Sequence, residues 1–207
     1  MQSDRPVTRQ RNRRGEGDKL RVDLVAAATR LLEHLPSPDA LSLRAVAREA
    51  GVSAPSIYQH FPDKQTLMRA VMVEQFDLLS DQVRAAASEF TSPDARLRAS
   101  IRGYADFAEQ NRGVYRVLFC PAQPESGTDA TELIGADTVN ELVEPIAECI
   151  EGGLMPPQDP FQCAVFLWST IHGSIMLRAS KRLFPWPPMD ETIDMALEAA
   201  CGLTFEA

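Results

Sequence analysis

Residues 41–67 read LSLRAVAREAGVSAPSIYQHFPDKQTL, and this stretch decides the fold. Ser42 is a residue type that caps helix N-termini and Gly51 is one that ends helices, so a short helix is predicted between them. Ser53 predicts the start of a second short helix, which tolerates Pro55 in its first turn. Two short helices joined by a turn that contains glycine are the signature of a helix-turn-helix.

The residue types inside this stretch meet the packing demands of such a motif. Ala47 is small where the two helices must approach closely, and Gly51 can adopt the left-handed conformation of the turn. Val52 and Ile57 supply apolar contacts beneath the second helix. That helix then presents a small, outward-facing set: Ala54, Pro55, Ser56 and Tyr58. Small residues early in the helix allow its N-terminus to enter the major groove of DNA, where the helix dipole favours phosphate.

The rest of the chain also shows helical periodicity. Apolar residues recur at three- and four-residue steps, and no segment shows the alternation of a strand. The sequence therefore predicts an all-α fold of about nine helices, an N-terminal three-helix domain followed by a larger helical domain. Besides the two short helices, the predicted helical segments are residues 18–35, 64–88 after the cap Asp63, the stretch after Pro93, 114–119, 129–151, 161–183 and 190–202.

Charge is distributed unevenly along the chain. The formal net charge of the whole chain is −8. Residues 1–70 carry 12 basic against 8 acidic side chains, a net charge of +4, whereas the remainder carries 9 against 21, a net charge of −12. Residues 1–17 are predicted to be a disordered basic arm, since they hold arginines and almost no apolar side chain. Its arginines are Arg5, Arg9, Arg11, Arg13 and Arg14. A basic N-terminal module on an acidic body indicates that one end contacts phosphate.

Several classes of protein do not fit this composition. The polar N-terminus is unlike a secretory signal and no apolar run is long enough to span a membrane, so a cytoplasmic protein is expected. The four cysteines, Cys120, Cys149, Cys163 and Cys201, lack the spacing of a zinc site or a disulfide framework and are expected to be reduced and largely buried. The histidines show no metal-binding spacing, and no nucleophile elbow or phosphate-binding glycine loop occurs. We therefore expect neither an enzyme nor a metal or cofactor.

Residues 41–67 resemble the DNA-binding signature of the tetracycline-repressor (TetR) family, and the resemblance covers roughly residues 20–70. Its most specific part is the combination of Tyr58, His60, Phe61, Lys64 and Leu67 at these spacings. Towards the C-terminus, Trp168, His172 and Gly173 are similar to a Trp-x-x-x-His-Gly element of one subgroup of that family, and residues 115–119 (YRVLF) are similar to the same subgroup. The resemblance implies a DNA-binding domain at residues 18–66 and a ligand-binding and dimerisation domain at residues 67–207.

The resemblance also implies roles in DNA binding. Arg44 would contact a base edge, with guanine as the natural partner, and Ala54 and Pro55 would make apolar contacts such as one to a thymine methyl group. Tyr58, His60 and Lys64 would bind phosphates. The full implied set is Ser42, Arg44, Ser53, Ala54, Pro55, Ser56, Tyr58, His60 and Lys64. Structural alternatives stay open: Tyr58 packing on the first helix, His60 bracing the turn, and Arg44 as a solvated helix residue.

The same resemblance implies a homodimer formed by the last two helices, a palindromic double-stranded DNA operator, and a small molecule held among the helices of the C-terminal domain. The candidate ligand-binding residues are Phe76, Tyr104, Phe107, Tyr115, Phe119, Trp168, His172 and Met176. Aromatic side chains and methionine at helical spacing also fit a plain core. The polar tips of tyrosine, tryptophan and histidine could orient a moderately apolar or aromatic ligand.

The predicted function is thus a ligand-responsive transcriptional regulator, most simply a repressor that a small molecule releases from its operator. Two alternatives belong to other classes. The first is a non-specific or architectural DNA-binding protein, against which the acidic body and single compact motif argue. The second is a partner-binding module that has lost operator binding, which the intact Arg44, Tyr58, His60 and Lys64 disfavour.

Overall fold

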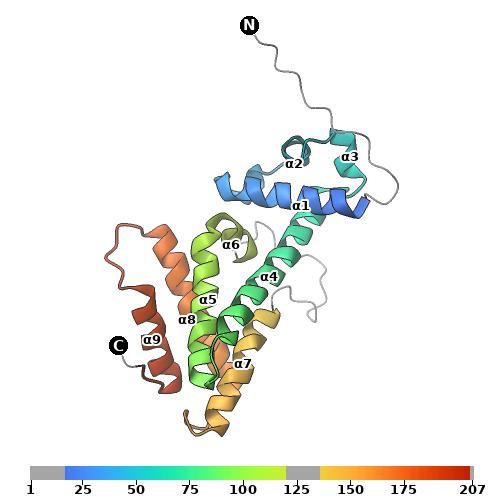
Figure 1. Ribbon diagram of the computed structural model, residues 1–207. Helices are drawn as coiled ribbons and strands as arrows, with labels where there is room; N and C mark the ends of the chain where they lie inside the picture. Colours follow the sequence, from blue (N-terminus) through green and yellow to red (C-terminus); the bar gives the residue numbers. More distant parts are fainter. Residues whose placement is uncertain (1–16, 120–135, 206–207) are drawn as a thin grey trace. The chain divides into compact units, whose positions relative to one another are not determined.

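The computed structural model describes residues 17–119 and 136–205. Within these ranges every regular element is helical, with nine α-helices and one short 3-10 helix and no strand (Figure 1). The predicted all-α fold is confirmed. The basic arm predicted for residues 1–17, apart from its last residue, and the predicted loop at residues 120–128 lie outside the described residues.

The described residues form two compact units, which we call unit one and unit two. Unit one contains residues 17–74 and 116–119, and unit two contains residues 75–115 and 136–205. Two helices, α4 (Lys64–Ser88) and α6 (Arg112–Phe119), contribute residues to both units.

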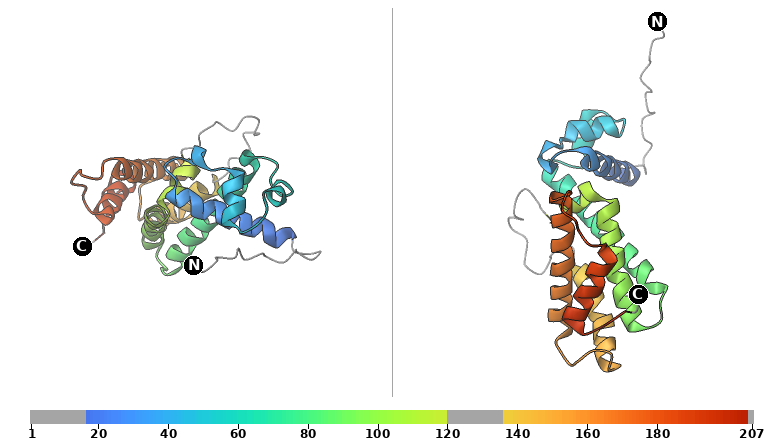
Figure 2. Two further views of the ribbon diagram at one scale, coloured as in Figure 1. Left: turned by 90° about the horizontal axis from the view of Figure 1, so that it is seen from above. Right: turned by 90° about the vertical axis from the view of Figure 1, so that its left-hand side faces the viewer.

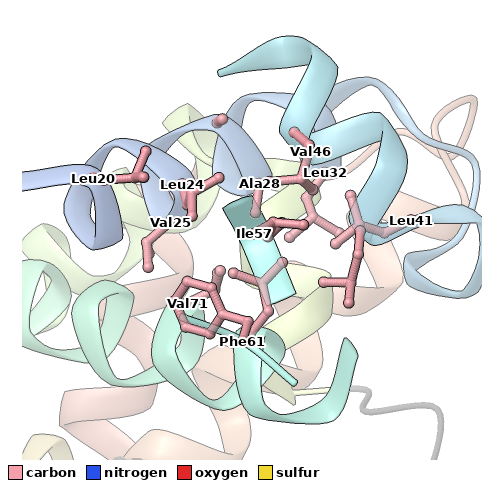
Figure 3. Packing of buried hydrophobic residues seen from close by; sticks show 14 of the residues in the cluster. Leu20, Leu24, Val25, Ala28, Leu32, Leu41, Val46, Ile57, Phe61 and Val71 are labelled. Atoms are coloured by element: carbon pink, nitrogen blue, oxygen red, sulfur yellow. The ribbon is translucent and has the colours of Figure 1, made fainter. Parts of the chain in front are cut away.

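Unit one is built on three helices that precede α4. These are α1 (Gly17–His34), α2 (Leu43–Glu49) and α3 (Ala54–Tyr58), with the 3-10 helix η1 (Pro38–Ala40) between the first two. Their apolar faces meet in one cluster, in which Leu24, Ile57 and Phe61 are fully buried (Figure 3). Full burial of side chains of this size stabilises the fold by about 1.5–3 kcal/mol each. The cluster therefore fixes where α3 lies relative to α1.

The boundaries of these helices follow from capping and turn residues. Ser42 Oγ accepts a hydrogen bond from the Ala45 amide at 3.2 Å, and Asp63 Oδ1 accepts one from the Thr66 amide at 2.7 Å. Each bond satisfies an amide that has no partner inside its helix. Gly51 adopts a φ of 69°, the left-handed conformation predicted for the turn between α2 and α3.

Unit two contains the later part of α4 and five further helical segments. They are α5 (Pro93–Gln110), the first residues of α6, α7 (Ala136–Glu151), α8 (Pro160–Ser180) and α9 (Met189–Cys201). Helix α5 packs against α7, α8 and α9, and α8 also packs against α7 and α9. Helices α8 and α9 run side by side (Figure 2, right). Leu97, Leu167, Ile171, Ile193 and Leu197 are fully buried between these helices.

Two predicted helices differ from the observed ones in extent. The helix predicted over residues 129–151 is described only from Ala136 onwards, because residues 120–135 lie outside the described ranges. The helix predicted over residues 161–183 ends at Ser180, because Lys181 leaves the helical conformation with φ −118° and ψ 60°. One side of α8 is buried within the chain, whereas Phe161, Phe166 and Leu177 are about half exposed.

None of the described helices combines the length and the apolar character that a membrane crossing requires.

Candidate DNA interface and effector site

The turn between α2 and α3 determines which side chains of unit one face solvent. The Val52 amide donates to the Ala47 carbonyl at 2.9 Å, which closes the turn around Gly51. Ile57 then points into the core with no exposed surface. Of the residues predicted to contact DNA, five are exposed, namely Ser42, Arg44, Ser53, Pro55 and Tyr58. The other four are half-buried, namely Ala54, Ser56, His60 and Lys64.

Ser53 occupies the N-cap position of α3, but its side chain makes no capping hydrogen bond. Ser53 thus starts α3 at the predicted position, but without a hydrogen bond from its side chain to the helix. Pro55 has no amide hydrogen to donate, and the Ser56 amide already donates to the Ser53 carbonyl at 3.0 Å. The Ser53 hydroxyl instead lies 2.7 Å from the Ser56 hydroxyl. The two hydroxyls form a small polar pair at the start of α3.

Tyr58 and Lys64 differ in how they are held. Tyr58 is 49% exposed, so it does not pack fully against α1. Lys64 Nζ donates a hydrogen bond to the Asp39 carbonyl at 2.9 Å. An ammonium group has three donors, so this bond fixes the position of Lys64 and leaves donors for a phosphate.

In unit two, four side chains from three helices form a hydrogen-bonded group, which we call the aromatic cluster: Tyr104, Tyr115, Trp168 and His172. The Tyr104 and Tyr115 hydroxyls are 2.7 Å apart, and the Tyr115 hydroxyl lies 2.6 Å from His172 Nδ1. Trp168 Nε1 donates to the Tyr104 hydroxyl at 3.1 Å. All four residues were predicted to bind a ligand, and the structure brings them together.

One hydrogen bond of the aromatic cluster has a fixed direction: an indole N–H can only donate, so the Tyr104 oxygen accepts from Trp168. The Tyr104 hydroxyl also lies 3.2 Å from His172 Nδ1, so Tyr104, Tyr115 and His172 are all within hydrogen-bonding distance of one another. Either hydroxyl can donate to the other, and the His172 tautomer follows from that choice. Burial lowers the pKa of His172, which favours the neutral ring. Burial also raises the pKa of Tyr104 to about 12, so its hydroxyl stays protonated.

A small cavity adjoins the aromatic cluster. Its free volume is about 10 Å³, which is the space of a single water molecule. Tyr104 and Trp168 line it, together with seven residues that were not predicted: Val83, Ser100, Ile101, Thr138, Leu142, Leu167 and Ile171. The only polar groups among these seven are the hydroxyls of Ser100 and Thr138, and none of the lining residues is charged. The cavity is therefore apolar, with its hydrogen-bonding groups confined to a few hydroxyls and one indole.

Six of the eight predicted ligand residues do not line this cavity, and two of these six, Tyr115 and His172, belong to the aromatic cluster. Phe76 and Phe107 are buried in unit two, and Met176 is half-buried on α8. Phe119 belongs to unit one. Their roles stay predictions.

Comparison with known proteins supports the same two parts of the chain. Residues 24–71 match the model of bacterial regulatory proteins of the tetR family, and residues 97–200 match that of a tetracyclin repressor-like C-terminal domain. The HTH-type transcriptional activator FasR of Mycolicibacterium smegmatis is 36% identical over 111 residues, which is 52% of this chain. The match spans about half the length of that relative (50%).

Solved structures share the fold. A protein of unknown function from Rhodococcus sp. RHA1 has a TM-score of 0.75 and 28% identity, over 95% of this chain and 97% of that one. A tetR-family transcriptional regulator from Streptomyces coelicolor has a TM-score of 0.64 and 20% identity, over 88% and 79% of the two chains. AibR, in complex with isovaleryl coenzyme A and operator DNA, has a TM-score of 0.61 and 21% identity, over 87% and 96%.

An exposed helix-turn-helix joined in one chain to a second helical unit defines a DNA-binding regulatory protein. Because both family models match and together cover most of the chain, the protein belongs to the tetR family of bacterial regulatory proteins. Members of this family are regulators and not enzymes.

Proposed function

We propose that the chain is a ligand-responsive transcriptional regulator that binds a palindromic operator as a homodimer and is released by a small molecule. The observation that carries this proposal is the exposed surface of α2 and α3, held outward by the Gly51 turn and the buried Ile57. In this proposal, residues 18–66 form the DNA-binding domain and residues 67–207 the effector-binding and dimerisation domain. The arginines of residues 1–17 add affinity for phosphate or the minor groove.

The residues of the proposed DNA surface make different kinds of contact with the DNA. Arg44 reads a base edge, most favourably guanine, and Pro55 together with Ala54 makes apolar contacts in the major groove. Tyr58, His60 and Lys64 bind phosphates, and Ser42 adds a further phosphate contact. The Ser53 and Ser56 hydroxyls, already paired at the start of α3, contact a base or phosphate.

The exposed apolar side chains of the last two helices support a homodimer. Phe161, Phe166 and Leu177 of α8 and Met195 of α9 are each more than half exposed. Four large apolar side chains on two neighbouring helices are costly to leave in water. Pairing α8 and α9 with their copies in a second protomer would cover them and present two copies of α3 to successive major grooves.

The aromatic cluster supports an effector site in unit two. The effector we propose has an apolar or aromatic body and an uncharged hydrogen-bonding group that meets the Tyr104, Tyr115 and His172 end. The 10 Å³ cavity is too small for any such molecule, so binding requires α5, α7 and α8 to move apart. The effector then favours the opened state, and that difference in affinity is what changes operator binding.

The test is a selection of bound sequences from random duplex DNA with the full-length protein. A palindromic consensus is the expected result, with half-site centres separated by about 34 Å or a multiple of that distance. Weak, steeply salt-dependent binding without any consensus would contradict operator recognition and indicate phosphate contacts alone. Arg182→Ala removes an exposed arginine of unit two, and it should select the same consensus as the wild-type protein.

Release from DNA is then tested with the selected operator. Uncharged aromatic carbonyl compounds are the probes that fit the proposed site, and isovaleryl coenzyme A, which AibR binds in its solved complex, is the comparison with a charged ligand. The expected effector lowers operator affinity of the wild-type protein and has less effect on the variant Tyr115→Phe. A compound that binds unit two without changing operator affinity would contradict this mechanism.

Activation is the second candidate outcome, and one observation favours it: the relative FasR is named as an activator. A reporter gene under a promoter that contains the selected operator separates the two. Higher expression after removal of the regulator means repression, and lower expression means activation.

A further inference from the structure

Two cysteines from different helices lie in contact within unit two. Cys163 is in the first turn of α8 and Cys201 is the last residue of α9. Their sulfur atoms are 3.1 Å apart although the residues are 38 positions apart in the chain. Both are buried, with 5% and 0% of their surface exposed. We call them the thiol pair.

The thiol pair is placed for bond formation. A disulfide has a sulfur–sulfur distance of about 2.0 Å, so closing the bond requires an approach of about 1 Å. Each sulfur lies at one end of its helix, where small backbone adjustments are least costly. The contact also joins two helices whose packing forms the core of unit two, so the sulfurs are held together by the fold.

The two thiols differ in their readiness to react. Either sulfur can donate in this contact, and the hydrogen bond with Cys201 lowers the pKa of Cys163. The same bond, together with burial, raises the pKa of Cys201. The positive end of the α8 dipole further favours a thiolate in the first turn. Cys163 is therefore the nucleophile and Cys201 the resolving thiol.

We propose that Cys163 and Cys201 form a peroxide-sensitive dithiol site whose reversible disulfide fixes the start of α8 to the end of α9. The Cys163 thiolate attacks one oxygen of hydrogen peroxide, breaking the O–O bond to give a sulfenic acid and hydroxide, which takes up a proton as water. The Cys201 sulfur then attacks the sulfenic sulfur and a second water leaves. In total, two thiols and one peroxide give one disulfide and two waters, and a dithiol reductant reverses the change.

Peroxide suits this site better than larger oxidants. It is small and uncharged, so it can reach a sulfur that has 5% exposure through ordinary fluctuations of the fold. Cys149 provides the internal comparison. It is also buried, but its pKa is raised to about 11, first by burial and then by Asp94, so it is a poor nucleophile. We therefore expect peroxide to react with Cys163 faster than with Cys149.

The disulfide would restrict the motion of α8 and α9, the helices that we propose contribute to effector binding and dimerisation. It closes a loop that contains most of α8 and α9, and such a cross-link restricts the motions available to both. Helix α8 also carries Trp168 and His172 of the aromatic cluster. Oxidation should therefore slow the opening of this part of unit two, whether or not the chain binds an operator.

The experiment treats reduced full-length protein with hydrogen peroxide and follows it by intact mass and non-reducing peptide mapping. We expect the loss of two hydrogen atoms in mass, a cross-linked peptide joining Cys163 to Cys201, slower amide hydrogen exchange in α8 and α9, and full reversal by dithiothreitol. Cys149→Ser is the matched control and should form the cross-link as the wild type does.

A second variant identifies the nucleophile. In Cys201→Ser the resolving thiol is absent, so a sulfenic acid should persist at Cys163 and be trapped by dimedone added together with denaturant. Oxidation confined to other cysteines, or cross-links only between chains, would overturn the proposal. Reaction at Cys149 at the same rate as at Cys163 would overturn it as well.

Discussion

Individual side chains of the proposed DNA surface are prepared for binding to different degrees. Lys64 is already held by the Asp39 carbonyl, whereas Arg44 is exposed and the described residues include no ion-pair partner for it. A side chain that is fixed before binding loses little conformational freedom on contact, and a free arginine loses more. Arg44 therefore has to recover this cost through a geometrically specific contact, which favours a base edge over a phosphate.

The substitution Arg44→Ala tests that inference. It should weaken operator binding by about 1–3 kcal/mol, roughly 5- to 150-fold, and relax sequence preference at one position of each half-site. Binding measurements on a set of single-base operator variants give both quantities. Arg182→Ala should leave them unchanged. A uniform loss across all operator variants would instead assign Arg44 to a phosphate.

His172 allows a second test at the same scale. Its pKa is lowered by burial, so the folded chain binds fewer protons than the unfolded chain, whose histidine titrates near pH 6.5. Stability should therefore fall as the pH drops through about 6.5 towards the folded pKa. His172→Asn keeps a hydrogen-bonding group near the Tyr115 hydroxyl and removes the titration. Urea unfolding at pH 7.5 and pH 5.5 should show a smaller loss in this variant, and an equal loss would contradict the neutral imidazole.

At the scale of elements, α3 depends on the turn that precedes it. It spans only Ala54–Tyr58, too short to be stable alone, so its direction comes from Gly51 and from the burial of Ile57. Gly51 has a φ of 69°, and a Cβ added there would meet nothing within 4 Å. A substitution at this position therefore acts through backbone conformation and not through a clash.

Two substitutions of Gly51 test whether backbone conformation is what constrains this turn. Gly51→Ala should destabilise the chain by about 1–2 kcal/mol, because a left-handed conformation is costly for residues with a Cβ. Gly51→Asn should cost less, since asparagine tolerates that conformation. Chemical unfolding of both variants supplies the comparison. An equal loss of stability in the two would show that something other than φ constrains this turn.

The sequence predicted most elements because their ends carry local signals. Ser42, Gly51 and Asp63 each act through bonds or conformations confined to a few residues, so their effects can be recognised without the tertiary structure. The helix end at Ser180 was missed because apolar periodicity continues past it to Leu183, which is fully exposed. No local signal distinguishes a buried leucine from one in solvent after the helix has ended.

The proposed effector site was only partly predictable for a related reason. Tyr104, Tyr115, Trp168 and His172 were selected because their side chains combine apolar rings with polar tips. The walls of the cavity, such as Leu142 and Leu167, belong to the same apolar stripes as the core. Whether a buried side chain borders an empty space depends on how several helices pack together, which periodicity along one helix does not contain.

For the whole molecule, the distribution of exposed apolar residues leads to a test of assembly. Phe166 on α8 is 52% exposed, and Val73 on α4 is 44% exposed. If α8 pairs with its copy, Phe166→Glu should shift the protein from dimer to monomer, because it would bury a charge at the interface. Val73→Glu, which introduces the same charge elsewhere, should leave the dimer intact. Light scattering across a concentration series measures this, and an equal effect of both variants would argue against the α8 interface.

The smallness of the cavity beside Trp168 also bears on how the regulator would be tuned. When a binding site is closed at rest, part of the effector's binding free energy is used to open it, so tight packing of unit two raises the dose needed for a response. Trimming a wall residue such as Leu142 would enlarge the cavity at rest and so make the regulator respond at lower effector concentrations. The effector concentration that triggers the response would then depend on how tightly the core of unit two is packed. Substitutions in that core could change this concentration without changing which effector the protein recognises.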